Sequence, residues 1–163
     1  MKDSYLSREE LVKFIATLPT RRLAAGAVIR NEHGELLLVQ PNYKDGWILP
    51  GGTVEAGEAP KPGCFREVEE ELGLRLAPGR LLLVFHGLAR GVWGDSTYYM
   101  YDAGVIAKST PVTLQTEELI TYEWVAPEQL QEYVNPGFAE RLHDCLRALR
   151  TGEVVEMSSD ERP

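Results

Sequence analysis

Near its start the chain carries apolar residues at helical spacing. Ser7 and Glu10 have the spacing of a capping box, in which each side chain accepts a hydrogen bond from the other residue's backbone N–H. Leucine, phenylalanine and isoleucine residues then recur three or four positions apart, and Pro19 ends the run. The pattern predicts an amphipathic N-terminal helix within residues 1–19.

Short apolar runs bounded by glycine, proline and asparagine follow this helix. Residues 23–29 and 35–39 are joined by a turn that contains Gly34, an arrangement typical of a β-hairpin. The same criteria predict further strands at residues 47–49, 81–88, 97–106 and 120–125.

Two longer segments have the period of helices. Residues 62–72 follow a loop rich in glycine and proline, and Gly73 ends them. Pro127 begins a short helix, and Asn135 and Pro136 begin a longer C-terminal one with its apolar side chains on one side. Because helices lie both between the strands and after them, the order predicts an α/β sandwich around a mixed β-sheet.

No repeat or linker divides the chain, and its 163 residues suit one domain with a substantial core. We expect this domain to cover residues 1–157, including the N-terminal helix. Residues 158–163 are polar, and we expect them to form a disordered tail.

The acidic balance of the chain limits its partners. The formal net charge is −8, so the protein as a whole repels nucleic acids and anionic membrane surfaces. A substrate that contains phosphate would need local cations or a metal ion. We therefore expect a small-molecule partner and neither nucleic acid nor membrane; a homodimer stays open.

Several features favour a cytoplasmic location. The first twenty residues are interrupted by charges and lack the apolar core of a signal peptide. No stretch approaches the ~20 apolar residues that cross a bilayer. Cys64 and Cys145 are too few for a disulfide framework and both fall in helical patterns, which indicates buried free thiols.

The chemistry is concentrated in the helix at residues 62–72. Glu67, Glu70 and Glu71 share one face of it, whereas its apolar residues share another. Like charges at these spacings cost a few tenths of a kcal/mol per pair. Arg66 reaches only one of the three at the i,i+4 spacing, so a hard divalent cation is the expected partner. A solvated acidic surface is the alternative reading of the glutamates alone.

The spacing of the whole segment favours the metal site. Residues 52–74 fit the pattern Gly-x5-Glu-x7-Arg-Glu-U-x-Glu-Glu-x-Gly-U, where U is bulky and apolar. With seven positions fixed by identity and usage of roughly one in fifteen each, chance agreement is on the order of one in 10⁸. The matching residues are Gly52, Glu58, Arg66, Glu67, Val68, Glu70, Glu71, Gly73 and Leu74.

This pattern resembles the Nudix box without a departure, and the order of elements is similar to that family's α/β/α sandwich. The resemblance implies hydrolysis of a diphosphate bond in a nucleotide-like substrate, with Mg²⁺ or Mn²⁺ as cofactor. It implies that Glu67, Glu70 and Glu71 ligate the metal, together with the carbonyl of Gly51. How many metal ions bind stays open.

The resemblance also implies roles for residues around the glutamates. Arg66 and Glu58 would form an ion pair that fixes the loop against the helix, and Gly73 would permit the turn at the helix end. Metal ions shield a diphosphate and acidify a bound water, and a carboxylate must then accept the water's proton. Glu118 stands where several relatives place such an acid in a loop; a solvated loop glutamate is the alternative.

Residues for substrate recognition are less sharply indicated. Lys44 and Arg90 lie in predicted loops near strand ends and are the candidate cations for phosphate. Trp47 and Tyr98 are candidates to stack on a base or sugar, although each also suits a structural role. The markers that distinguish several Nudix sub-families are absent, so the substrate stays open.

A second class of function has to be considered. Some Nudix-like domains bind a nucleotide ligand for sensing and have no catalytic activity. Such domains often lose carboxylates of the box, whereas this chain retains all of them. It also lacks the basic patch that a DNA-binding regulator requires. The enzyme is therefore the favoured reading, and the ligand-sensing domain is the alternative.

Overall fold

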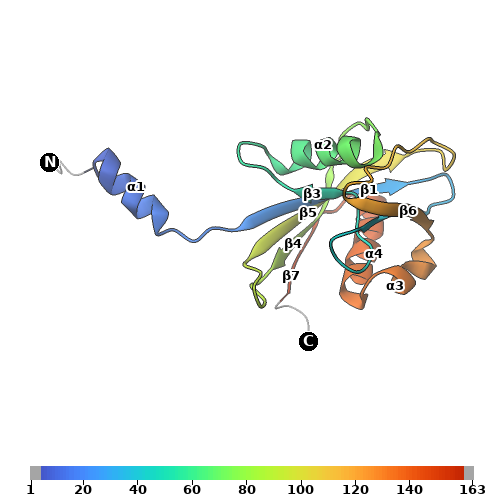
Figure 1. Ribbon diagram of the computed structural model, residues 1–163. Coiled ribbons are helices and arrows are strands. Elements are labelled where there is room, and N and C mark those ends of the chain that lie inside the picture. Colours follow the sequence, from blue (N-terminus) through green and yellow to red (C-terminus); the bar gives the residue numbers. More distant parts are fainter. Residues whose placement is uncertain (1–4, 160–163) are drawn as a thin grey trace.

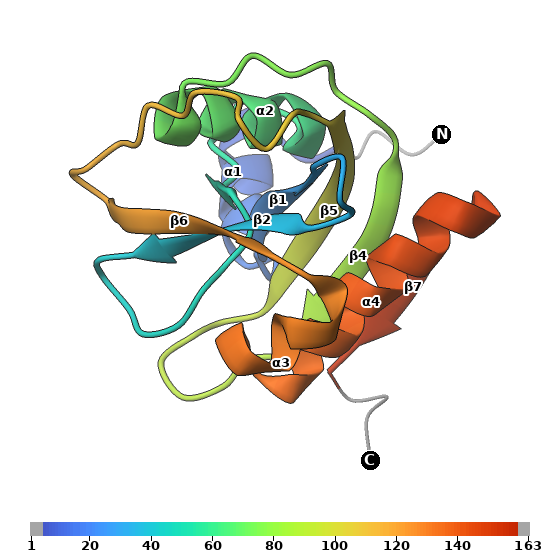
Figure 2. The ribbon, with the colours of Figure 1, turned by 90° about the vertical axis from the view of Figure 1, so that its right-hand side faces the viewer.

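A mixed β-sheet with a helix layer on each face forms the body of the protein (Figures 1 and 2). The structure is a computed structural model, and it describes residues 5–159. The helices are α1 (Arg8–Ala16), α2 (Pro60–Leu72), α3 (Leu130–Tyr133) and α4 (Pro136–Thr151), and a 3-10 turn, η1 (Pro127–Gln129), precedes α3. The strands are β1 (Arg22–Arg30), β2 (Leu36–Pro41), β3 (Gly51–Thr53), β4 (Leu81–Gly87), β5 (Ser96–Val105), β6 (Leu119–Val125) and β7 (Val155–Ser158).

The strands are arranged in the order β6-β2-β1-β5-β4-β7, and β3 pairs with β1 beside this path. β1 lies near the centre, antiparallel to β2 and β3 and parallel to β5. β4 is antiparallel to β5 and parallel to β7. The sheet is therefore mixed, and the sandwich predicted from the order of elements is confirmed.

Alternate residues of β1 point to opposite faces of the sheet, as the pleat requires. Ala27 and Ile29 belong to a core cluster with Val68 of α2. Val28 belongs to a second cluster, with Leu142 of α4. Because both faces are covered, the strand consists of a nearly continuous apolar run. Figure 2 shows α2 above the sheet and α4 with α3 below it.

The N-terminal helix forms as predicted but does not pack on the body. Both bonds of the capping box are present, from Ser7 N–H to the Glu10 carboxylate at 2.8 Å and from Glu10 N–H to Ser7 Oγ at 3.2 Å. No residue of α1 is buried, and the helix stands away from the sheet in Figure 1. The capping residues thus fix the helix locally, while its apolar face stays exposed.

Two expectations need correction. The strand expected at residues 47–49 is reduced to an isolated bridge between Ile48 and Val39, and the pairing with β1 comes later, from β3. β3 lies so close to β1 that a Cβ on Gly51 would be 2.0 Å from the Ala25 carbonyl oxygen. Two glycines in this strand provide that approach, and glycine is a residue that propensity does not associate with strands.

The second correction concerns the C-terminal segment. The polar tail was expected to begin at residue 158. Ser158, however, is the last residue of β7 and pairs with His86 of β4, and Ser159 donates its backbone N–H to the His86 carbonyl. Residues 160–163 lie outside the described residues, so disorder there stays a prediction. Among the helices of residues 5–159, none has both the length and the apolar character of a membrane span.

Candidate active site

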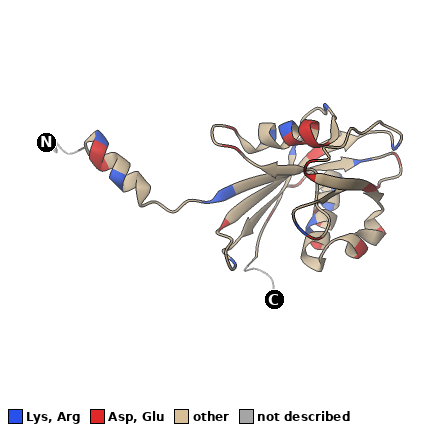
Figure 3. Cartoon of the chain, in the orientation of Figure 1, with Lys and Arg blue, Asp and Glu red and all other residues tan. Residues whose placement is uncertain are grey.

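Helix α2 presents the glutamates because its two sides face different surroundings. Its apolar side packs on the sheet through Cys64, Phe65, Val68 and Leu72. Gly73 ends the helix in the left-handed region at φ 65°, which glycine adopts without strain. The acidic side then lies beside β3 and the loop that follows it, and Figure 3 shows acidic and basic residues gathered on this helix.

Glu71 is the most unusual residue of the helix. It is only 3% exposed, and its Oε2 accepts a hydrogen bond of 2.9 Å from the Gly51 N–H. Burial, together with the charges of Glu67 and Glu118, raises the pKa of Glu71 to about 8, against the effect of that bond. No ion pair within residues 5–159 includes Glu71. A buried carboxylate without a cationic partner is costly, and a divalent cation would supply that partner.

Glu67 lies against β3. A Cβ on Gly52 would approach the Glu67 carboxyl carbon to 2.9 Å, so the absence of a side chain at Gly52 leaves room for this carboxylate. Burial raises the pKa of Glu67, while Arg66 acts in the opposite direction. Each of the two glycines at the start of β3 therefore contacts one carboxylate. Gly51 donates its N–H to Glu71, and Gly52 leaves room for Glu67.

Arg66 forms the ion pair with Glu58 that the motif predicts, and it holds two further carboxylates. Its Nη2 and Nε lie 2.8 and 3.1 Å from the two Glu58 oxygens, which is a bidentate contact. Its Nη1 lies 3.1 Å from both Glu67 and Glu70. The Arg66 contact lowers the pKa of Glu58 to about 2, helped by the Glu55 N–H. This network fixes the loop before α2 to the helix.

Glu118 comes from a different part of the chain than the other glutamates of this cluster. It lies in the loop that precedes β6, and its charge raises the pKa of both Glu67 and Glu71. The loop is bound to α2 through the Gln115 N–H, which donates to the Glu71 carbonyl at 2.9 Å. The structure thus brings Glu118 close to glutamates of the box that lie far from it in the sequence.

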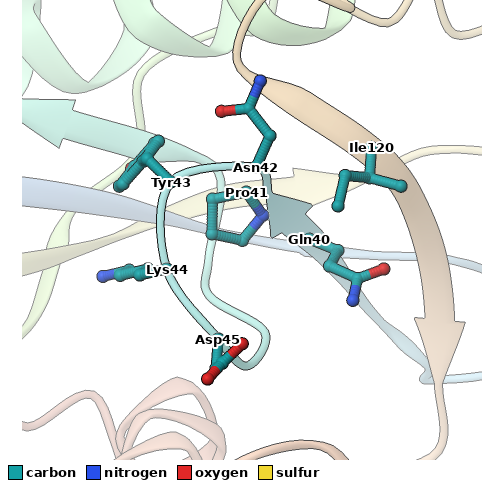
Figure 4. Close-up of a pocket in the computed structure, with 7 residues that line it drawn as sticks. All are labelled: Gln40, Pro41, Asn42, Tyr43, Lys44, Asp45 and Ile120. Atoms are coloured by element: carbon teal, nitrogen blue, oxygen red, sulfur yellow. The ribbon is translucent and has the colours of Figure 1, made fainter.

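A pocket of about 420 Å³ opens beside the cluster (Figure 4). Tyr43 lines it, and burial with the charges of Glu71, Glu118 and Glu67 raises the pKa of its phenol. The Lys44 ammonium lies 5.9 Å from the centroid of the Tyr43 ring. The pocket is lined by Gln40, Pro41, Asn42, Tyr43, Lys44, Asp45 and Ile120. Of the predicted phosphate contacts, Lys44 is therefore the one that lines this pocket.

The other predicted substrate contacts have different surroundings. Trp47 packs edge to face on Tyr133 at 5.4 Å, on the α4 side of the sheet. Tyr98 lies in that same cluster, with its hydroxyl where a Cβ on Gly26 would stand. Arg90 lies in the β4–β5 loop and forms a backbone bridge with Trp93. These contacts suit structural roles, so substrate binding by these three residues stays a prediction.

The carboxylates are arranged around Arg66 and not around an empty centre. Within residues 5–159, no three His, Cys, Asp or Glu side chains converge as ligands of one metal ion. Glu67 and Glu70 both turn to the guanidinium. Hard carboxylate oxygens are nevertheless the ligands that Mg²⁺ prefers, and buried Glu71 has an oxygen without a cationic partner. The donor set therefore fits the metal that the motif implies.

Comparisons with known proteins agree with the geometry. A family model described as the NUDIX domain matches residues 20–147. A "MutT-like protein" of Streptomyces ambofaciens is 28% identical over 131 residues, covering 78% of this chain and 79% of that protein. Diphosphoinositol polyphosphate phosphohydrolase 2 of Rattus norvegicus is 43% identical over 72 residues, covering 43% of this chain but only 40% of that protein. The crystal structure of a MutT protein from Methanosarcina mazei Go1 has a TM-score of 0.69 and 28% identity, covering 83% of this chain and 100% of that one.

Proposed function

This chain belongs to the NUDIX domain family and is a hydrolase, and from that premise we propose that it cleaves a diphosphate bond in a nucleoside diphosphate-linked small molecule or a nucleoside triphosphate. The observation that carries the proposal is the buried carboxylate of Glu71, bound to the Gly51 N–H beside Glu67 and Glu118. A cluster of this kind is stable at neutral pH only with protons or a cation, and a metal-dependent hydrolase requires the cation.

Glu67, Glu70 and Glu71 would hold Mg²⁺ or Mn²⁺, with the carbonyl of Gly51 as a further ligand. When bound, the metal supplies charge neutralisation for the diphosphate and acidifies a water molecule. Arg66 holds Glu67 and Glu70 in place before the cation arrives. Its bidentate pair with Glu58 keeps the loop closed against α2, so the carboxylates start from a fixed arrangement.

Glu118 would act as the general base. Its side chain has no ion pair within residues 5–159, whereas Arg66 engages two glutamates of the box. In the reaction, Glu118 removes a proton from water, and the water oxygen bonds to phosphorus. The bridging P–O bond breaks, and its electron pair leaves with the second phosphate. A positioned carboxylate contributes about 10²–10⁴-fold to such a proton transfer.

Lys44 and Tyr43 would contact the substrate beyond the scissile bond. The ammonium group offers a positive charge to a phosphate, and the exposed ring offers a surface for a sugar or base. Arg90 is a second candidate for the phosphate. Direct contact of Trp47 and Tyr98 with the substrate stays a prediction, and their packing in the core would also shape the sheet beneath the site.

The relatives that act on diphosphoinositol polyphosphates define a competing substrate class. Such a substrate carries many phosphates and would need several cations. The pocket offers Lys44 next to Asp45, and the chain has a net charge of −8. These charges favour a nucleoside-linked diphosphate, which has fewer negative charges to neutralise.

The cysteines support a cytoplasmic location for this activity. Cys64 and Cys145 are both free and buried. Burial raises the pKa of each thiol to about 12, so neither forms a thiolate at neutral pH. Free thiols of this kind suit a reducing compartment.

A phosphate-release screen tests the proposed reaction. Purified protein is incubated with nucleoside triphosphates, nucleoside diphosphate sugars, ADP-ribose and a diphosphoinositol polyphosphate, with Mg²⁺, with Mn²⁺ or with EDTA. We expect turnover of a nucleoside-linked compound that depends on the metal. Tight binding of such a compound without turnover in either metal would instead indicate the non-catalytic ligand-sensing domain.

A magnesium titration of two neighbouring variants tests the general base. We expect Glu118→Gln to lower kcat by about 10²–10⁴-fold and to leave the magnesium concentration for half-maximal rate unchanged. Glu117→Gln is the matched control and should retain the wild-type kcat. If excess magnesium rescued Glu118→Gln, the residue would be a metal ligand. If both variants had normal kcat, Glu118 would have no part in catalysis.

A further inference from the structure

The loop that carries Glu118 is fixed to α2 at its first end. Thr113 donates its backbone N–H to the Leu72 carbonyl at 3.0 Å, and Gln115 donates to the Glu71 carbonyl at 2.9 Å. These are the last carbonyls of the helix, which have no partner within it. The start of the loop therefore keeps a fixed position relative to the glutamates of the box.

The second end of the loop is fixed by Asn42, at the end of β2. The Asn42 backbone N–H donates to the Glu118 carbonyl at 2.8 Å, and this bond continues the pairing of β2 with β6. The Asn42 side chain adds a bond from Nδ2 to the Glu117 carbonyl at 2.7 Å. Figure 4 shows this amide directed toward the chain that enters β6. Asn42 thus binds the carbonyl that precedes the Glu118 Cα and the carbonyl that follows it.

The bond from the Asn42 side chain depends on the residue being asparagine, whereas the bond from its backbone N–H does not. Any residue except proline could supply the backbone N–H at position 42. The Nδ2 donor requires a short amide, because it has to reach the neighbouring carbonyl while the main chain stays in register. Glu118 forms no side-chain hydrogen bond or ion pair in the described part of the chain. Its direction is therefore set by its backbone, which Asn42 holds.

We propose that Asn42 is a positioning residue for Glu118: it holds the Glu117 carbonyl and thereby aims the Glu118 carboxylate at the acidic cluster. This inference rests on the proposed role of Glu118 as general base. The next residues along the chain, Tyr43 and Lys44, line the pocket beside that cluster. Residues 42–44 would therefore supply both the substrate contacts, Tyr43 and Lys44, and the residue that positions the base, Asn42.

The first test separates placement of the base from substrate binding. We expect Asn42→Ala to lower kcat by on the order of tenfold, since a displacement of about 1 Å can cost as much as 10²-fold. KM should change little, because Tyr43 and Lys44 are retained. Asn42→Asp keeps the shape of the side chain but removes the Nδ2 donor, and it should show the same split. It also serves as the test if Asn42→Ala does not fold.

Asn135→Ala is the matched control. Asn135 is also an exposed asparagine, and its Oδ1 accepts a hydrogen bond of 2.8 Å from the Phe138 N–H. Its removal also eliminates one side-chain to backbone bond, which is partly buried and lies at the start of α4, away from the acidic residues. The control should lower the melting temperature and leave kcat unchanged.

A double-mutant cycle shows whether Asn42 acts through Glu118. If it does, Asn42→Ala should lower kcat in the wild type but produce no further loss in the Glu118→Gln background. Equal losses in both backgrounds would overturn the inference while leaving the general base intact. A normal kcat for Glu118→Gln would instead contradict the proposed role of Glu118 as general base, and a normal kcat for both Asn42 variants would contradict the positioning role alone.

Discussion

Helices α2 and α4 cover opposite faces of one sheet, yet only one of them follows the ordinary rules of a stable helix. The N-cap of α4 is Asn135, whose side chain accepts a hydrogen bond from the Phe138 N–H, and its C-cap is Gly152. Asp144 and Arg147 form a partly exposed pair at 2.9 Å on its polar side. These features of α4 can be explained by packing, capping and solvation.

α2 departs from these rules in several places. Its N-cap residue is Ala59, which has no side chain that could accept a hydrogen bond from the first turn. Its polar side places Glu67, Glu70 and Glu71 together, and Glu71 is buried. Local features that lower stability without a compensating contact concentrate at functional sites. The difference between the helices therefore supports the proposed site on α2 by an argument that does not depend on the motif.

The largest effect is expected for Glu70→Gln. Loss of a metal-ligating carboxylate should lower kcat by at least ~10²-fold through lost activation of water, while the helix survives because glutamine is a comparable helix former. Glu69→Gln is the control on the same helix, since the ion pair of Glu69 within residues 5–159 is with exposed Arg75, and it should keep the wild-type kcat. Wild-type turnover of Glu70→Gln at saturating magnesium would show that the proposed metal site is wrong.

Arg66→Ala should lower both stability and activity. Its removal leaves Glu58, Glu67 and Glu70 without the cation they share. Breaking a buried pair costs about 3–5 kcal/mol, but Arg66 is 27% exposed, so we expect about 2–3 kcal/mol. That loss corresponds to a fall in Tm of roughly 4–12 °C.

Thermal melts of the metal-free protein measure this loss. Arg75→Ala removes an arginine that is 86% exposed and is the control for charge alone. An unchanged Tm in Arg66→Ala would contradict the view that Arg66 fixes the loop to α2.

Glu71→Gln should have the opposite effect on stability. The pKa of Glu71 is about 8 in the folded state against 4.5 in the reference, so the folded state binds more protons in this range. Stability of the metal-free protein then falls as pH rises from about 4.5 to about 8. Glutamine does not titrate and still accepts the Gly51 N–H bond, so the variant avoids this loss.

At neutral pH we expect Glu71→Gln to be more stable than the wild type by on the order of 3 kcal/mol in EDTA, since each pH unit above 4.5 costs the wild type about 1.4 kcal/mol. The gain should be absent at pH 4 and level off above pH 8. The same variant should lack activity, because it has lost a metal ligand. A Tm below that of the wild type across this range would mean that burial does not penalise the carboxylate.

The sequence predicts those parts of the fold that depend on local pattern. The hairpin of β1 and β2, helix α2 with Gly73 at its end, and the capping box of α1 all follow from spacing within a few residues. β7 was missed because it is fixed by pairing with β4, which lies about 70 positions earlier. The position of α1 away from the body was missed because an apolar face indicates a partner but not where that partner lies.

The site shows the same division. The box glutamates were predicted because the motif specifies their spacing on one helix. Asn42 was missed because its side chain bonds a carbonyl 75 positions away, and Asn42 looks like an ordinary turn residue in the sequence. The roles of Trp47 and Tyr98 could not be assigned because an aromatic residue in an apolar run suits a core as well as a pocket.

The smallest effect is expected for Asn135→Ala, which tests the other half of the comparison. Loss of a helix cap typically costs about 1 kcal/mol, which corresponds to a fall in Tm of roughly 2–4 °C. The cause is local, since the Phe138 N–H loses its partner while the apolar contacts of Phe138 and Leu142 with the sheet are retained. In Asn135→Ala we therefore expect stability to change without a change in activity: Tm falls, whereas kcat and the magnesium requirement stay at wild-type values. A loss of kcat comparable to that of Arg66→Ala would mean that α4 transmits its position through the sheet to the acidic residues, and the two faces of the sheet would then not be independent.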